Sequence, residues 1–252
     1  MLSIERRNII LARLQIEKKV LVGELSAEFG VSEETIRRDL ERLEKEGHAT
    51  RTYGGAILCE DLRLELPYTI RKQINVEAKQ KIAAKVAGLI NDGDYIMLEE
   101  SSTSTFVARA IRDKKNITLI TNSIEIIIEL AGAEGWNILS TGGSLKPNVL
   151  ALAGHQAEAF IRDYHVDKAI ISCTAIDFER GYTDAGEDNA RVKRAMMAAA
   201  EETILAVDSR KFGKKAFATI GDLSDLTALV TDAEPEEEWK TALDERGVKL
   251  IY

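Results

Sequence analysis

The chain has 252 residues, of which 45% are hydrophobic and 30% are charged. This length allows one large domain or a small domain followed by a medium one, and the apolar fraction is sufficient for a packed core. No run of 18 apolar residues occurs, so we expect no transmembrane helix. The first 14 residues interleave Glu5, Arg6, Arg7 and Arg13 with apolar residues, which predicts an amphipathic helix and not a signal peptide.

The cysteines and histidines offer no metal-ligand pattern. Cys59 and Cys173 are far apart, without CxxC spacing, which argues against a disulfide framework or a zinc site and favours a reducing cytoplasm. His48, His155 and His165 lack metal-ligand spacing as well. No GxxxxGK[ST] motif for binding a nucleoside triphosphate occurs. We therefore expect neither a metal nor a cofactor.

The net charge of −8 is unevenly distributed. Residues 1–58 contain ten Lys or Arg and ten Asp or Glu, whereas residues 59–252 contain 24 and 32. Binding to nucleic acid needs a locally basic surface and not a basic protein. The neutral first segment is therefore compatible with DNA binding.

In chain order, the first predicted helix covers residues 3–16, with Ile4, Ile9, Ile10 and Leu14 facing inward. A short apolar helix follows at about Val22–Phe29, and Gly30-Val31 joins it to a second helix at about Glu33–Glu46. Ser32 can cap this helix, acidic residues suit its first turn, and Gly47 suits the position after its end.

The helix at 33–46 has two distinct faces. At about 100° per residue, Ile36, Leu40 and Leu43 share a face that must pack against a core. The opposite face carries Glu34, Arg38, Arg42 and Lys45, with Thr35 and Arg37 on its flanks. Two helices joined by a tight turn, the second with outward arginines, indicate a helix-turn-helix. Two β-prone arms at 49–56, with Gly54-Gly55 as the turn, predict a wing carrying Arg51 and Tyr53.

Charged helix faces are usually only solvated, and a helix of this kind could also serve protein interaction. The order of the surrounding elements favours DNA binding. The series TIRRDL, LE, G and R-x-YGGA, at Thr35–Leu40, Leu43-Glu44, Gly47, Arg51 and Tyr53–Ala56, resembles the signature of DeoR-type bacterial transcriptional regulators. The resemblance implies DNA contacts by Thr35, Arg37 and Arg38, and by Arg51 and Tyr53 from the wing; Glu34 and Arg42 are further candidates on the same face.

A charged connector at residues 59–75 contains Pro67, one of only three prolines. The shift in composition predicts a domain boundary, giving a DNA-binding domain at 1–58, a linker at 59–75 and an effector-binding and oligomerisation domain at 76–252. DeoR-type regulators carry similar P-x-x-x-R and K-x-x-I-A patterns, here Pro67, Arg71, Lys79, Ile82 and Ala83.

From residue 76 onward, short apolar runs alternate with helical segments, which predicts an α/β fold with a mainly parallel sheet covered on both faces. Strands are predicted at about Tyr95–Leu98, Ile117–Ile120, Asn137–Ser140, Lys168–Ser172, Thr203–Val207, Leu226–Val230 and Val248–Ile251. Helices are predicted at about Val76–Ile90, Thr105–Arg112, Ser123–Ala131, His155–Arg162, Asp188–Glu201 and Glu236–Glu245.

Small polar residues follow four of these strands. Ligands of such sheets bind outside the carboxyl ends of the strands, so we expect these residues to form an effector site. The candidates are Glu99, Ser101, Ser102, Thr103, Ser104 and Thr105 after the first strand, Thr121 and Asn122 after the second, Gly142 and Gly143 after the third, and Asp208 and Lys211 after the fifth.

Hydroxyls beside helix N-termini suit a phosphate, Lys211 would add a positive charge, and Asp208, Asn122 and Glu99 could bind sugar hydroxyls. In any single loop, Ser and Thr are more simply N-caps. The convergence of four loops favours a pocket over that alternative.

The resemblance to DeoR-type regulators extends to this region, whose effector domains are similar to ribose-5-phosphate isomerase. It covers Thr121-Asn122, Gly142-Gly143, Asp208 with Lys211-Phe212-Gly213, and Val192–Met196, which adds Lys193 as a candidate. The first loop departs from the family's D-x-G pattern, because Glu99 and Ser101 stand in place of Asp and Gly. Ser172–Ala175 also lacks the expected glycines.

The sequence therefore predicts a cytoplasmic, homodimeric or homotetrameric transcriptional regulator and not an enzyme. It would bind operator DNA and repress a carbohydrate operon under the control of a phosphorylated sugar or related metabolite. The alternative is a sugar-phosphate isomerase or hydrolase with an appended DNA-binding module, in which Glu99, Asp208 and Lys211 would perform acid–base chemistry.

Overall fold

The computed structural model describes residues 1–59, 61–62 and 64–252. Glu60 and Arg63, which belong to the predicted linker, lie outside the described residues. The chain divides into two compact units, Met1–Ile74 and Asn75–Tyr252, so the division falls near the end of that linker. No helix formed by the described residues has both the length and the apolar composition needed to cross a membrane.

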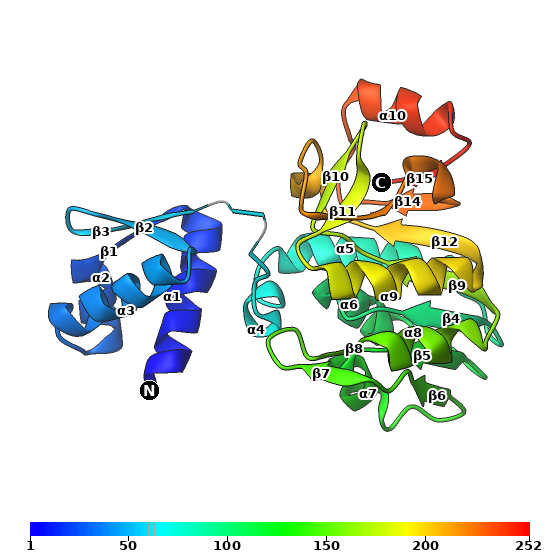
Figure 1. Cartoon of the computed structure of the whole chain (residues 1–252), viewed down its shortest axis with the longest axis horizontal. Helices are drawn as coiled ribbons and strands as arrows, with labels where there is room; N and C mark the ends of the chain where they lie inside the picture. Colours follow the sequence, from blue (N-terminus) through cyan, green and yellow to red (C-terminus); the bar gives the residue numbers. More distant parts are fainter. Residues whose placement is uncertain (60, 63) are drawn as a thin grey trace. The chain divides into compact units, whose positions relative to one another are not determined.

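The first unit is a helical module with a small antiparallel sheet (Figure 1). Its elements are α1 (Ser3–Glu17), β1 (Lys19–Leu21), α2 (Val22–Phe29), α3 (Glu33–Lys45), β2 (Ala49–Thr52), β3 (Gly55–Leu58) and α4 (Tyr68–Arg71). The strand order is β1-β3-β2. The predicted helices at 22–29 and 33–46 and the wing are confirmed, but the turn lies at Tyr53-Gly54, because Gly55 already pairs with Leu21 as the first residue of β3.

The core of this unit contains Ile10 and Leu14 of α1 together with the inner faces of α2 and α3. The prediction that Ile4 and Ile9 also face inward was wrong, because their side chains are 54% and 39% exposed. Leu11 takes their place in the core. Part of the predicted linker belongs to this unit, since α4 contributes the buried Ile70 to the same core.

The second unit is built on a seven-stranded sheet within the described residues, in the order β15-β14-β12-β9-β4-β5-β6. Its strand pairs are all parallel. The strands are β4 (Tyr95–Leu98), β5 (Thr118–Thr121), β6 (Asn137–Ser140), β9 (Val166–Ile171), β12 (Ala200–Ala206), β14 (Ala228–Val230) and β15 (Lys249–Ile251). The predicted mainly parallel α/β fold is confirmed.

Helices cover both faces of this sheet, as predicted (Figure 1). Their bounds are α5 (Val76–Ala87), α6 (Ser102–Ala110), α7 (Ile124–Leu130), α8 (His155–Arg162), α9 (Glu187–Ala198) and α10 (Glu237–Asp244). Residues of α5, α6 and α7 share one core with the sheet, whereas α8 and α9 share another. The second helix of this unit, α6, begins at Ser102, three residues earlier than predicted, because Ser101 caps it.

Two small antiparallel sheets were not predicted. The hairpin of β7 (Ser144–Lys146) and β8 (Ala151–Ala153) follows the Gly142-Gly143 loop, and β10 (Ala175–Asp177), β11 (Gly181–Asp184) and β13 (Ala218–Gly221) form the other sheet. Single 3₁₀ turns cover Ser209–Lys211 and Leu223–Asp225. The second small sheet and α10 share a core with Leu205 and Leu229 of the large sheet and with Ala190 of α9.

Candidate DNA-binding surface and effector site

Local sequence and packing fix the position of α3. The Ser32 hydroxyl accepts a hydrogen bond from the Thr35 amide at 3.2 Å and caps the helix. Ile36, Leu40 and Leu43 are buried, as predicted. This inner face holds the helix in the core, so its outer face is presented to solvent.

A buried ion pair ties α3 to α1. Asp39 is on the inner side of α3, where its carboxylate accepts a hydrogen bond from Arg6 Nε at 2.5 Å. Arg7 Nη1 lies 3.7 Å from the other oxygen of the same carboxylate. Removing either member of a buried pair leaves an uncompensated charge, so this contact fixes the orientation of α3 within the unit.

The outer face of α3 carries four cations, and each has an acidic neighbour one turn away. Arg37 pairs with Glu33 at 2.5 Å, Arg38 with Glu34 at 3.2 Å, Arg42 with Glu46 at 2.6 Å and Lys45 with Glu41 at 2.7 Å. These side chains are exposed, Arg38 most of all at 76%. Exposed pairs of this kind contribute little energy, so a phosphate or a guanine edge can displace the carboxylates.

The wing is attached to the end of α3 through Arg51. Its Nε donates to Glu44 Oε2 at 2.7 Å and its amide donates to Oε1 at 2.9 Å. These two bonds lower the pKa of Glu44. Tyr53 is fully exposed at the turn. Gly55 permits the close approach of β3 to β1, because a Cβ there would lie 2.1 Å from the Val20 carbonyl oxygen.

In the second unit, the predicted polar loops follow adjacent parallel strands. Asp208 follows β12, Glu99 follows β4, Asn122 follows β5 and Gly142 follows β6. The strand between β12 and β4 is β9, which ends at Ile171 and is followed by Ser172. Because the carboxyl ends of parallel strands meet at one edge, these five loops lie along a single edge of the sheet.

Glu99 is at the centre of this edge and its carboxylate is fully engaged. Oε2 accepts from the Ser101 amide at 3.0 Å and lies 3.2 Å from Lys193 Nζ. Oε1 accepts from the Ser104 hydroxyl at 2.7 Å and from the Ser172 amide at 3.2 Å. Glu99 therefore connects two strand-end loops with α9, and it is not a free ligand for sugar hydroxyls.

Lys193 is buried among three carboxylates. Its Nζ lies 2.7 Å from Asp184 Oδ2, 3.2 Å from Glu99 and 3.8 Å from Glu100. Burial alone would lower the pKa of Lys193, but the three carboxylates raise it well above its ordinary value. Lys193 therefore stays protonated and holds the acidic groups together.

Most of the predicted hydroxyls are also engaged within the chain. Ser101 Oγ caps α6 by accepting from the Ser104 amide, Thr105 Oγ1 donates to the Ser101 carbonyl, and Thr121 Oγ1 donates to the Leu98 carbonyl. Ser102 and Thr103, in the first turn of α6, are buried. The N-cap interpretation thus accounts for Ser101, while Thr105 and Thr121 also bond to nearby backbone.

Two buried side-chain oxygens differ from these hydroxyls. Asn122 uses its amide nitrogen to donate to Glu100 Oε2 and to the Leu152 carbonyl. Among the residues that the structure describes, Asn122 Oδ1 and Ser172 Oγ have no hydrogen-bond partner. Buried polar atoms normally have a hydrogen-bond partner.

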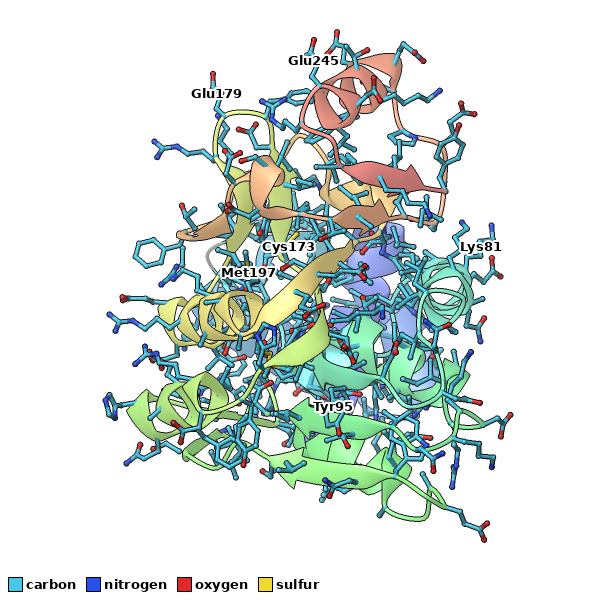
Figure 2. The ribbon with its side chains drawn as sticks, turned by 90° about the vertical axis from the view of Figure 1, so that its right-hand side faces the viewer. Lys81, Tyr95, Cys173, Glu179, Met197 and Glu245 are labelled. Carbon is cyan, nitrogen blue, oxygen red and sulfur yellow. The ribbon has the colours of Figure 1, made fainter. Side chains whose placement is uncertain are left out.

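The loop after β12 brings a lysine to the same edge. Lys211 Nζ donates to the Cys173 carbonyl at 2.6 Å and lies 3.8 Å from Asp208. Asp208 also accepts from Asn75 Nδ2 at 3.1 Å. Figure 2 shows Cys173 in the interior of this unit, where burial raises the pKa of its thiol to about 12. Cys173 is thus an inert neighbour of the lysine.

The glycine loop after β6 is exposed, with positive φ values of 64° at Gly142 and 104° at Gly143. A Cβ at Gly143 would lie 2.7 Å from the Ala153 carbonyl oxygen, so this position needs glycine for the loop to pack on β8. Three other residues at the edge, Ser172, Asp184 and Asn75, were absent from the predicted set. The pairing of β9 between β12 and β4 brings Ser172 to the edge, and no local motif marks it.

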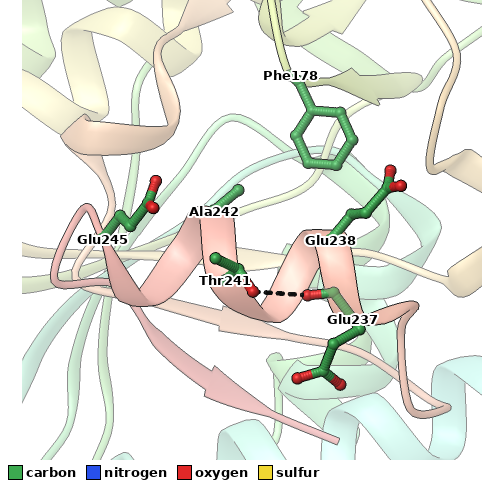
Figure 3. Close-up of a pocket in the computed structure, with 6 residues that line it drawn as sticks. All are labelled: Phe178, Glu237, Glu238, Thr241, Ala242 and Glu245. Carbon is green, nitrogen blue, oxygen red and sulfur yellow. Dashed lines mark hydrogen bonds between the residues drawn. The ribbon is translucent and has the colours of Figure 1, made fainter.

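A separate hollow lies on α10 (Figure 3). It has a volume of about 440 Å³ and is lined by Phe178, Glu237, Glu238, Thr241, Ala242 and Glu245. Thr241 donates to the Glu237 carbonyl within the helix. Three carboxylates disfavour an anionic ligand here, and none of the predicted site residues lines it.

Two family models together match most of the chain. A DeoR-like helix-turn-helix domain matches residues 6–61, and a DeoR C terminal sensor domain matches residues 74–233. The chain is 38% identical to the uncharacterized HTH-type transcriptional regulator YulB of Bacillus subtilis, over 99% of this chain and 96% of that protein. It is 34% identical to the putative aga operon transcriptional repressor of Escherichia coli O157:H7, over 98% and 93%.

Among solved structures, the chain is similar to ribose 5-phosphate isomerase A from Methanocaldococcus jannaschii. The sequence identity is 19%, the TM-score is 0.42, and the match covers 56% of each chain.

Proposed function

Because the chain belongs to the DeoR family of helix-turn-helix transcriptional regulators, we propose that it represses a carbohydrate operon under the control of a phosphorylated sugar or related metabolite. The observation that carries this proposal is the combination of an exposed arginine face on α3 with a polar edge on a separate sensor unit. The aga operon relative is named a putative transcriptional repressor, which supports the proposal that this chain represses an operon.

In the proposed complex with operator DNA, α3 lies in the major groove. Arg38 is the most exposed cation on that face and is the candidate for a bidentate contact with guanine, with Thr35, Arg37 and Arg42 beside it. Glu34 would discriminate against wrong bases. Arg51 and Tyr53 would contact the backbone from the wing.

Selection of binding sites from a random DNA pool with the full chain tests the operator proposal. We expect a defined motif at moderate salt. Recovery of sequences without a common motif would contradict sequence-specific binding. Because one small module makes few contacts, we propose a homodimer or homotetramer acting on repeated half-sites, so the selected motif should contain two copies of one half-site.

The proposed effector site is the polar edge of the parallel sheet, with Lys211 as a cation for the phosphate and Asn122 for hydroxyls. A thermal-shift screen of sugar phosphates tests it, because a ligand at 100 times its Kd stabilises the folded state by about 2.7 kcal/mol. We propose that the effector binds the DNA-incompetent state more tightly, which lowers operator affinity.

An enzymatic function would require Glu99, Asp208 and Lys211 to act as acid–base groups. Glu99 accepts hydrogen bonds from three donors and pairs with Lys193, which leaves it poorly placed for proton transfer. Steady turnover of ribose 5-phosphate by the full chain would overturn the proposal of a pure sensor.

A further inference from the structure

The order in which the chain adds strands to the parallel sheet reverses between β9 and β4. From β4 the chain moves outward through β5 to β6, and it then returns to the other side of β4 and continues through β9, β12, β14 and β15. Open α/β sheets bind ligands at such a switch point, outside the carboxyl ends of the strands. In this chain the switch point lies between Glu99, after β4, and Ser172, after β9.

The two oxygens without a hydrogen-bond partner, Ser172 Oγ and Asn122 Oδ1, lie on either side of the residues that follow β4. Ser172 reaches Glu99 through its amide, and Asn122 reaches Glu100 through its side-chain nitrogen. Both residues are at most 1% exposed. With a strand spacing of about 4.8 Å, the ends of β9 and β5 are roughly 10 Å apart.

Leaving a buried hydroxyl or amide oxygen unbonded costs free energy in the folded state. The side-chain oxygens of Glu99, Ser101, Ser104 and Thr121 each have a partner in the chain. Ser172 Oγ and Asn122 Oδ1 differ from these oxygens, because a ligand can bond to them without breaking an existing hydrogen bond.

The charge at this point selects the kind of ligand group. The carboxylates of Glu99, Glu100 and Asp184 all lie within 3.8 Å of Lys193 Nζ. A phosphate placed there would lie beside three buried carboxylates, which would repel it in a medium of low dielectric constant. Asn122 Oδ1 can only accept a hydrogen bond, and Ser172 Oγ can accept or donate, so both suit the hydroxyl groups of a sugar.

We propose that Ser172 and Asn122 form an inner subsite for the hydroxyl-bearing end of the effector, whose phosphate faces outward to Lys211. The inference rests on the proposed function and deepens it, because it adds Ser172 as a ligand-binding residue and assigns an orientation to the ligand. Glu99, which stands where the family pattern has Asp, positions the Ser172 loop and does not bind the ligand.

The test compares Ser172→Ala with Ser123→Ala in the full chain. Ser123 is a matched control, because it is equally buried at a neighbouring strand end but its hydroxyl caps α7. Without ligand, Ser172→Ala should not lower the Tm, since its hydroxyl has no partner among the described residues, whereas Ser123→Ala should lower it.

The ligands used in the test are ribose 5-phosphate, glucose 6-phosphate, glycerol 3-phosphate and inorganic phosphate, each measured by calorimetry. For the organic phosphate that binds the wild type best, we expect Ser172→Ala to raise the Kd at least tenfold. The Kd for inorganic phosphate should stay the same in Ser172→Ala and rise in Lys211→Ala.

Three outcomes would overturn the proposal. An unchanged Kd for the organic phosphate in Ser172→Ala would contradict the proposed subsite and would not affect the proposed function. A higher Kd for inorganic phosphate in Ser172→Ala would show that the phosphate binds at Ser172, which is the opposite of the proposed orientation. If no organic phosphate binds the wild type, the effector class of the proposed function fails and the subsite fails with it.

Discussion

The ion pair between Arg6 and Asp39 should be essential for presenting α3 to DNA. Replacing Asp39 by Ala removes the acceptor of a 2.5 Å hydrogen bond and leaves Arg6 buried without its counter-ion. Breaking a buried pair from one side costs about 3–5 kcal/mol. Asp39 faces the core, so the substitution leaves the solvent-exposed surface of α3 unaltered.

The size of the first unit makes this cost decisive. At about 0.05–0.15 kcal/mol per residue, the 74 residues of Met1–Ile74 give a free energy of unfolding of about 4–11 kcal/mol. Losing about 3–5 kcal/mol would remove a large fraction of it or all of it. We expect Asp39→Ala to abolish operator binding while the second unit stays folded.

Amide hydrogen exchange in the full chain is the appropriate assay, because it reports the opening of each unit separately. Protection of α1 and α3 should fall in Asp39→Ala and not in Glu41→Ala, which removes an exposed pair with Lys45. The double variant Arg6→Met/Asp39→Leu should recover protection. A cost below about 1 kcal/mol for Asp39→Ala, or no recovery in the double variant, would refute the reasoning.

Three further predictions concern single side chains. Arg38→Ala should weaken specific operator binding by about 1–3 kcal/mol and relax discrimination at one base position, measured by fluorescence anisotropy across operator variants; equal losses on all sequences would indicate a phosphate contact instead. Lys211→Ala should weaken the effector response and leave operator binding intact; an unchanged response would remove Lys211 from the site. Burial alone would raise the pKa of Asp208, but Lys211, Arg210, Asn75 and Lys79 outweigh it and lower the pKa below its ordinary value. The resulting stability is present above the unfolded-state pKa near about 4 and is lost as the pH falls through the lowered pKa. Asp208→Asn should therefore flatten the loss of Tm between about pH 5 and pH 3, and parallel curves for variant and wild type would contradict this assignment.

The sequence predicted those elements whose signals are local. Ser32, Gly47 and the spacing of Ile36, Leu40 and Leu43 suffice to define α3, because capping and helical periodicity depend on neighbouring residues. The parallel strands were predictable for the same reason, since each is a short apolar run. By contrast, Ile4 and Ile9 were misplaced because α1 is apolar on more than one side, so its own pattern does not select the buried face.

The candidate site was predictable only in outline. The residues that follow each strand are visible in the sequence, but the order of the strands is not, and the position of β9 between β12 and β4 brings Ser172 to the edge. The engagement of Glu99 with Ser101, Ser104 and Lys193 depends on tertiary contacts. A sequence shows that Glu99 is acidic and near a strand end, but not that its carboxylate is already occupied.

The central claim is that a metabolite bound by the second unit controls operator binding by the first. The most direct test measures the Kd of the full chain for its selected operator with and without a saturating sugar phosphate that stabilises the protein. The account predicts a change of about 5–150-fold, the range expected for allosteric coupling. An unchanged operator Kd, with the ligand shown to be bound under the same conditions, would contradict it.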